Sequence, residues 1–430
     1  MRPPHQAAQL SRRKLLAVSL SATTLAACGR AANSADSVGA GATSASAVTT
    51  APATAAPSPT LASPSAGPTP SPTPTPSPTP TALAGWSLEQ KVGQLLMVGT
   101  DATAASGTAS SAITDLHVGG VFLSGRSGAG VAATRRVVDS LRALVGADST
   151  HSTPLLVSTD QEGGQVQVLR GQGFSRMPDA LAQGGQGAGL AATAAGWAQE
   201  LAGAGVNMNL APVADLVDLA NPGANAPIGA FGREYGHDLA TVRAGVEAFA
   251  AGMEQGGIIP TLKHFPGLGR VAKNTDVSSG VTDSLTGPDD PAVALFAELA
   301  KASSKRVVMV SSAYYTLLDG SAPAVFSKAV VTDLLRSKLG FGGVVITDDV
   351  SAAAQLAAWT PGQRAVWTPG QRAVSAVRAG CDIVLASGAP WLIGEMAAAL
   401  VSAAQADAAF AAQVDAAVER VLALKAQLPG

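Results

Sequence analysis

The residues with the clearest capacity for chemistry are two adjacent carboxylates and a Lys-His pair, each associated with a short apolar run. Asp348 and Asp349 directly follow residues 343–347 (GVVIT), and Lys263 and His264 lie within a second such run. A carboxylate fixed in this way can act as a nucleophile, bind a metal ion or form a structural ion pair. These three roles are open for Asp348 from its position alone.

The positions of the histidines and the absence of common catalytic motifs argue against a metal site and against two classes of enzyme. Metal-dependent hydrolases usually present paired histidines or clustered carboxylates. The histidines of this chain are scattered, and no Gly-x-Ser-x-Gly or phosphate-binding loop pattern is present, which argues against a serine hydrolase or an NTPase. We therefore expect neither a metal nor another cofactor. The five histidines are His5, His117, His151, His237 and His264.

The elements that must position these side chains are short β-branched runs separated by alanine-rich stretches, from Trp86 onward. Continuously apolar strands that alternate with helices are typical of a parallel sheet buried on both faces. Eight runs favour a closed (β/α)₈ (TIM) barrel over an open doubly wound sheet, and the remaining length of about 340 residues suits that barrel. The predicted strands are residues 94–99, 118–123, 155–160, 206–213, 258–265, 307–313, 343–349 and 382–387.

In such barrels, catalytic groups project from the carboxyl ends of the strands and the loops that follow them. The third predicted strand ends at Asp160, the fifth at Lys263 and His264, and the seventh at Asp348. We therefore expect these polar groups to converge at one mouth of the barrel.

Several ordered motifs between Trp86 and Leu428 resemble those of the single-domain β-N-acetylhexosaminidases of glycoside hydrolase family 3. A further segment around Arg233 resembles the family's IGxRxFG with a shifted spacing. Bacterial lipoproteins are among the members that this chain resembles. The matching segments are residues 160–166 (DQEGGQV), 209–215 (NLAPVAD), 263–267 (KHFPG) and 341–349 (FGGVVITDD).

This resemblance implies a retaining mechanism with a covalent glycosyl-enzyme intermediate, in which Asp348 is the nucleophile. It also implies that four residues bind the hydroxyls of a terminal N-acetylglucosamine. Lys and Arg side chains donate to hydroxyl oxygens and an Asp accepts from hydroxyl protons, which fits that role. The four residues are Asp160, Arg233, Lys263 and His264.

The chain departs from the family where the acid/base is expected. The family continues as KHFPGHGxxxxDSH, with the final His acting as acid/base on a mobile loop, whereas this chain has Leu268 at the second His. Residues 274–276 (NTD) stand where Asp-Ser-His is expected.

Three explanations remain open. We favour Asp276 as the acid/base, which needs a raised pKa to hold its proton near neutrality. Alternatively, Asp276 only caps its loop, and the protein is a slow enzyme or a sugar-binding lipoprotein. Thirdly, a weak acid/base could favour phosphate over water as the acceptor.

The first 28 residues have the features of an export signal: a basic segment, a short apolar stretch and small residues before Cys28. The ending Leu-Ala-Ala-Cys resembles a bacterial lipobox, and Arg12-Arg13 resembles a twin-arginine signal. We expect cleavage before Cys28 and lipid attachment to its thiol. Residues 29–85 are rich in Ala, Ser, Thr and Pro, so we expect a disordered tether.

We predict that residues 86–430 form one catalytic barrel, monomeric and lipid-anchored on the outer face of the cell envelope. The expected activity removes terminal N-acetylglucosamine from peptidoglycan fragments. Because 28 Lys and Arg balance 30 Asp and Glu, we expect no nucleic-acid partner. Residues 359–366 (WTPGQRAV) are repeated as 367–374, which lengthens the loop after the seventh strand. We leave a role for this duplication open.

Overall fold

The computed structural model describes residues 83–357 and 367–428. The predicted export signal, Cys28 and nearly all of the predicted tether lie outside the described residues, as does the first copy of the repeated octapeptide. Leu83 is already buried in the core, so the folded region begins shortly before Trp86. None of the helices in the described ranges is long and apolar enough to cross a membrane.

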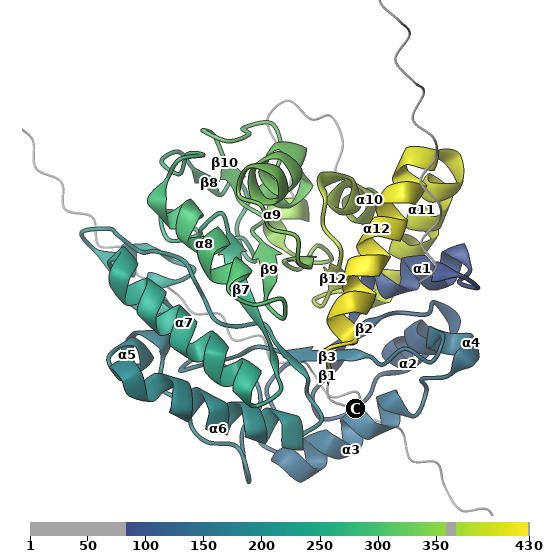
Figure 1. Ribbon diagram of the computed structural model, residues 1–430, viewed down its shortest axis with the longest axis horizontal. Helices are drawn as coiled ribbons and strands as arrows, with labels where there is room; N and C mark the ends of the chain where they lie inside the picture. The colour runs from purple at the N-terminus through teal and green to yellow at the C-terminus, as the bar shows by residue number, and fades with distance from the viewer. Residues whose placement is uncertain (1–82, 358–366, 429–430) are drawn as a thin grey trace, which may run out of the picture. The chain divides into compact units, whose positions relative to one another are not determined.

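Eight parallel strands form a barrel, which confirms the predicted fold class (Figure 1). The strands follow one another around the sheet in the order β11-β9-β7-β6-β3-β2-β1-β12, and a parallel bridge between Ile346 and Ile383 joins its two ends. The strands are β1 (Leu96–Asp101), β2 (Gly120–Ser124), β3 (Leu156–Thr159), β6 (Met208–Asn209), β7 (Ile259–Phe265), β9 (Val307–Val310), β11 (Val345–Thr347) and β12 (Val384–Ala386).

Each of the eight predicted apolar runs overlaps one of these strands, although β1 and β2 extend past the predicted ends at residues 99 and 123. The largest difference is at β6, which has two residues where the sequence predicted residues 206–213. Pro212 has no N–H to donate to a ladder, and regular pairing stops before it. An isolated bridge between Val213 and Lys263 then continues the contact with β7.

Helices cover the barrel and connect its strands (Figure 1). Several of them begin with a side-chain cap: Ser87 forms a capping box with Gln90 at α1, and Asp238 accepts from two amides at α7. The α-helices are α1 (Leu88–Gln94), α2 (Gly107–Asp115), α3 (Val131–Arg142), α4 (Ala147–Thr150), α5 (Ala180–Gly184), α6 (Leu190–Gly203), α7 (Leu239–Gln255), α8 (Pro291–Lys301), α9 (Ala354–Ala357), α10 (Pro369–Ala379), α11 (Ile393–Ala406) and α12 (Ala408–Lys425). A π-helix spans Ala329–Lys338.

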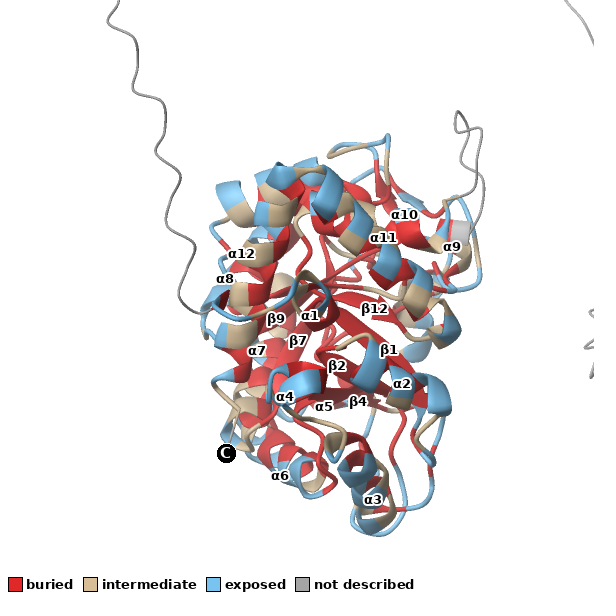
Figure 2. Cartoon of the chain, turned by 90° about the vertical axis from the view of Figure 1, so that its right-hand side faces the viewer, coloured by how far each residue is buried: buried red, intermediate tan, exposed pale blue. Residues whose placement is uncertain are grey.

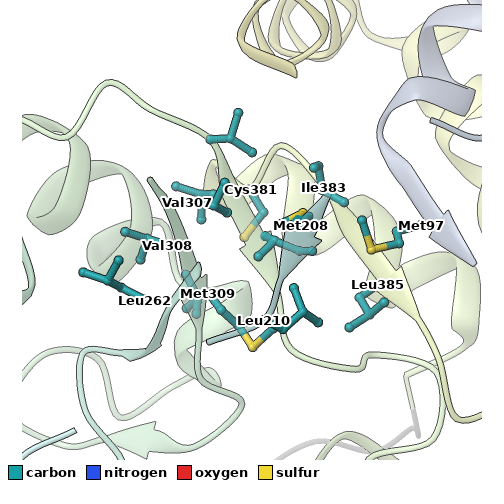
Figure 3. Packing of buried hydrophobic residues seen from close by; sticks show 14 of the residues in the cluster. Met97, Met208, Leu210, Leu262, Val307, Val308, Met309, Cys381, Ile383 and Leu385 are labelled. Atoms are coloured by element: carbon teal, nitrogen blue, oxygen red, sulfur yellow. The ribbon is translucent and has the colours of Figure 1, made fainter. Parts of the chain in front are cut away.

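The core follows the alternation of strands and helices. Figure 2 shows the strands and the inner faces of the helices buried, with exposed residues on the outer helix faces. Inside the sheet, methionine and branched side chains pack together, among them Met97, Met208 and Met309 (Figure 3). This apolar filling leaves the carboxyl ends of the strands for polar groups.

Short extra strands shape the loops at that end. β4 (Gln161–Gly163) and β5 (Val166–Gln167) form an antiparallel hairpin directly after β3. β8 (Thr282–Asp283) pairs in parallel with β10 (Tyr314–Tyr315), which joins the loops after β7 and β9. The polar segments that follow β3 and β7 are therefore held by backbone pairing.

The second copy of the repeated octapeptide begins α10. Thr368 and Gln371 form a capping box, and Trp367 stacks on Phe326 with ring centroids 4.5 Å apart. Arg372 is buried and donates to the carbonyls of Val350 and Ser351. This copy thus holds the segment that follows Asp348.

Candidate active site

A pocket of about 330 Å³ opens at the carboxyl end of the barrel. All six residues predicted to act on or bind the substrate line it, so the structure brings them together from β7 itself and from the loops after β3, β6, β7 and β11. These residues are Asp160, Arg233, Lys263, His264, Asp276 and Asp348.

The two adjacent aspartates after β11 have different surroundings. Asp349 accepts hydrogen bonds from the amides of Ser351, Ala352 and Ser387 and from the Ser351 hydroxyl. Among the described residues, the carboxylate of Asp348 accepts one, from the Asp349 amide at 2.8 Å. Asp349 is therefore committed to holding its loop, whereas Asp348 is available to a ligand.

The electrostatics of the pocket favour the protonated form of Asp348. Burial, reinforced by the negative charge of Asp276, raises the pKa of Asp348 to about 6. His264, the Asp349 amide and Lys263 oppose this rise without cancelling it. Asp348 therefore gains and loses its proton near the pH at which many cells work.

Asp276 lies on the loop after β7 and faces the same pocket. The residue as a whole is exposed, but protein surrounds its carboxyl group on the pocket side. This desolvation raises the pKa of Asp276, with further contributions from the charges of Asp349 and Asp160, while His264 and Arg233 oppose the rise. A carboxyl group with a raised pKa can serve as a general acid.

Leu268 stands where the resembling family has a histidine. Its side chain is 2% exposed and lines the pocket, and its amide donates to Asp215 at 2.9 Å. The substitution therefore leaves an apolar wall at this point, and Asp276 is the titratable residue that this loop contributes to the pocket.

The predicted sugar-binding cations are held by a carboxylate that the sequence analysis missed. Glu162 accepts from both the Nε and the Nη2 of Arg233, at 2.8 and 2.7 Å, and lies 2.6 Å from the Nζ of Lys263. Lys263 also contacts Asp160 at 2.7 Å. Glu162 is thus the centre of a buried ion network beneath the pocket.

The charges within this network stabilise one another. Burial alone would raise the pKa of Glu162, but Arg233 and Lys263 outweigh it and lower that pKa to about 2. Burial likewise opposes the charge of Lys263, and Asp160 and Glu162 outweigh it, so that the pKa of Lys263 is raised. Glu162 and Lys263 are therefore charged at neutral pH, and together with Arg233 and Asp160 they can present fixed donors and acceptors.

His264 is oriented from beneath by Asp215, which is fully buried. The Asp215 carboxylate lies 2.8 Å from the Nδ1 of His264 and also accepts from the His264 amide at 3.0 Å. One ring nitrogen is therefore committed to a buried carboxylate while the side chain lines the pocket. Asp215 belonged to a recognised motif, but its role as a support for His264 was not predicted.

A barrel whose mouth joins two carboxyl groups of raised pKa to fixed polar donors and acceptors has the equipment of a glycoside hydrolase. Within residues 83–357 and 367–428, no group of three or more His, Cys, Asp or Glu side chains is placed to hold a metal ion.

The chain belongs to glycosyl hydrolase family 3, because residues 87–424 match the pattern described as the Glycosyl hydrolase family 3 N terminal domain. The expected resemblance to the β-N-acetylhexosaminidases of this family is confirmed, and with it the expectation of a glycoside hydrolase.

The similarities extend over most of the barrel. The crystal structure of a β-N-acetylhexosaminidase from Beutenbergia cavernae is 53% identical with a TM-score of 0.76, covering 80% of this chain and 99% of that one. The β-hexosaminidase LpqI of Mycobacterium tuberculosis is 33% identical over 281 residues, 63% of this chain and 67% of LpqI. A secreted glycosyl hydrolase of Arthroderma benhamiae is 34% identical over 240 residues, and the match spans 53% of this chain and 64% of that protein.

Proposed function

We propose that this protein is a retaining exo-β-N-acetylglucosaminidase that releases terminal N-acetylglucosamine from peptidoglycan fragments. The observation that carries the proposal is the presence of Asp348 and Asp276, both with raised pKa, in one small pocket above a fixed set of charged side chains. The family and the hexosaminidases similar to this chain support the sugar specificity.

The first step forms a covalent intermediate. A carboxylate oxygen of Asp348 attacks the anomeric carbon, while Asp276 donates its proton to the glycosidic oxygen. The bond between the anomeric carbon and that oxygen breaks, and the leaving sugar departs as an alcohol. The reactive form of the pocket is therefore the one in which the two carboxyl groups share a single proton, held on Asp276.

The second step releases the sugar. Asp276, now ionised, takes a proton from a water molecule, whose oxygen attacks the anomeric carbon and displaces Asp348. Two inversions return the original anomeric configuration. Asp276 regains its proton and Asp348 its negative charge, so that the pocket is ready for another cycle.

The buried ion network provides the sugar-binding groups. We propose that Lys263, Arg233 and His264 donate to sugar oxygens and that Asp160 accepts from a hydroxyl. Glu162 keeps both cations in place in the absence of substrate. The pocket volume lies near the lower end of the range for ligand sites, roughly 300–1,000 Å³. A pocket of this size suits one terminal sugar.

The charges of the pocket favour water over phosphate as the acceptor. Its lining includes four carboxylates, while Lys263 and Arg233 are already paired with Asp160 and Glu162. A phosphate approaching Asp276 would meet like charge. The ion pairs of the site therefore do not support a phosphorylase.

A sugar-binding protein without catalysis is the other alternative. Such a protein gains nothing from Asp348, whose raised pKa shows that its ionised form is disfavoured in the folded state. Asp349 alone would be enough to hold the loop after β11 in place. The environment of Asp348 therefore favours an enzyme.

We further propose that the protein is exported and anchored by a lipid on Cys28. The basic and apolar stretches before Cys28 support this proposal, as does the secreted relative. Cys28→Ala in the full chain should move the protein from the membrane pellet to the soluble fraction. Continued sedimentation with membranes would contradict the lipid anchor.

The decisive experiment follows hydrolysis of an aryl β-N-acetylglucosaminide by nuclear magnetic resonance, with and without phosphate. We expect β-N-acetylglucosamine as the first product in both conditions. A sugar 1-phosphate would favour the phosphorylase, and the absence of any turnover would favour the binding protein.

A further inference from the structure

The loop that carries Asp276 is anchored at its beginning by buried polar side chains. Asp215 accepts from the amide of Leu268, and the side-chain amide of Asn225 donates to the carbonyls of Leu268 and Val271 at 2.7 and 2.8 Å. Both anchoring side chains are fully buried. The chain therefore leaves β7 along a fixed path.

The far part of the same loop is held by Gln355 of α9. The side-chain oxygen of Gln355 accepts from the amide of Val281 at 2.9 Å, and its side-chain nitrogen donates to the Val281 carbonyl at 3.2 Å. Gln355 is 2% exposed, so these two bonds are shielded from water. A side-chain amide bound in this way fixes both the distance and the orientation of the backbone it contacts.

Backbone hydrogen bonds from α9 reach Asp276 itself. The amide of Ala354 donates to the carbonyl of Asp276 at 3.1 Å, and the amide of Gln355 donates to the carbonyl of Thr275 at 3.0 Å. The Asp276 amide in turn binds the side chain of Asn274. Thr275 and Asp276 are thus held in register with the first turn of α9, and Asn274 braces Asp276 from within the loop.

The same helix follows directly on the segment of Asp348. Asp349 binds the amides of Ser351 and Ala352, and Ala352 and Ala353 line the pocket. The support of Asp276 and the support of Asp348 are therefore parts of one continuous stretch of chain.

We propose that Gln355 is a positioning residue that sets Asp276 at a working distance from Asp348. This inference rests on the proposed function, because it assigns a role in proton transfer. A general acid must lie within hydrogen-bond reach of the leaving oxygen. Displacement of a reacting group by about 1 Å can cost roughly 100-fold in rate. We call the two hydrogen bonds between the Gln355 side chain and Val281 the clamp. The clamp fixes the position of the Asp276 loop before substrate binds.

The test uses Gln355→Met, which keeps an unbranched side chain and removes both hydrogen bonds. With a phenyl β-N-acetylglucosaminide, whose leaving group needs a proton, we expect kcat/KM, which reports the first step, to fall about 10- to 100-fold. With the 2,4-dinitrophenyl substrate, whose leaving group needs no acid, kcat/KM should change less than about threefold. Equal losses of kcat/KM on both substrates would overturn the proposal.

A matched control separates positioning from general destabilisation. Gln94 is 1% exposed and binds Lys425 and the carbonyl of His117 just before β1, at the other end of the barrel. Gln94→Met should lower the melting temperature without any dependence on the leaving group. The same dependence in this control would remove the specific role of Gln355.

Hydrogen exchange gives a readout that does not rely on activity. In Gln355→Met the amides of residues 275–281 should exchange faster, while those of β7 keep their protection. Unchanged exchange in this loop would overturn the clamp. If exchange rises but Asp276→Ala shows no leaving-group dependence, the clamp exists but has no catalytic role, and the assignment of Asp276 fails instead.

Discussion

The negative charge of Asp276 raises the pKa of Asp348, although the two residues follow different strands of the barrel, β7 and β11. The two carboxyl groups therefore titrate as a pair and not as independent acids. This coupling gives the pocket states in which the two carboxyl groups hold one proton between them, and the proposed mechanism uses the one in which Asp276 carries that proton.

The first prediction concerns the nucleophile. Asp348→Asn should reduce hydrolysis of an aryl β-N-acetylglucosaminide by several orders of magnitude, as removal of a covalent nucleophile does in other enzymes. Asp349→Ala is the matched control, and it should lower the melting temperature because three amides and a hydroxyl lose their acceptor. Near-parental activity of Asp348→Asn would refute the assignment.

The second prediction concerns the acid/base. Asp276→Ala should lose about 100-fold or more in kcat/KM on substrates with poor leaving groups and much less on activated ones. Azide, which can enter the vacated space and attack without a general base, should restore turnover of the activated substrates as a glycosyl azide. A uniform loss with no rescue would leave Asp276 as a loop residue.

The third prediction concerns pH. Below the lower pKa of the pair both carboxyls are protonated and the nucleophile is lost; above about pH 6 the pair loses its last proton and with it the acid. The profile of kcat/KM should therefore be bell-shaped, with its alkaline limb near pH 6. Asp276→Ala should abolish the alkaline limb, and its persistence would assign that limb to another group.

The fourth prediction links the site to stability. The pKa of Asp348 is higher in the folded protein, about 6, than the roughly 3.9 of an unfolded aspartate, so the folded state binds the proton more tightly. Stability therefore falls as pH rises from 4 to 6. Asp348→Asn should be more stable than the parent at pH 7, by an amount on the order of 1–3 kcal/mol. Urea unfolding should show no such difference at pH 4.

The fifth prediction concerns the ion network. Glu162→Gln leaves Arg233 and Lys263 without their shared buried carboxylate, which should cost about 3 kcal/mol of folding free energy and raise KM. Asp160→Asn is the matched control: Asp160 is more exposed, so its loss should raise KM with a smaller effect on urea unfolding. Equal stability losses would show that Glu162 has no special structural role.

The sequence predicted the barrel because burial on both faces makes each parallel strand a visible apolar run. Because the carboxyl end of a parallel strand can be identified from the sequence, it also predicted that Asp160, Lys263, His264 and Asp348 gather at the mouth. Arg233 and Asp276 were predicted only from the resemblance to the family. The strand bounds were less accurate where Pro212 interrupts the pairing of β6 with β7.

The sequence did not predict which of several neighbouring carboxylates would bind the buried cations. In residues 160–162 the pattern marks Asp160, yet Glu162 is the group that joins both cations, because side-chain direction depends on the hairpin of β4 and β5. Gln355 was missed for a similar reason. A glutamine in an alanine-rich segment has no local signal, and its partner Val281 lies in another loop.

The duplicated octapeptide allows one of its copies to be lost without loss of the residues that anchor α10. Thr368, Gln371 and Arg372, which cap α10 and hold the carbonyls behind Asp348, all belong to the second copy. Because both copies are identical, loss of either one during replication leaves the same sequence, Ala358 followed by one complete WTPGQRAV. The repeat length can therefore contract in descendants without removing a single anchoring residue.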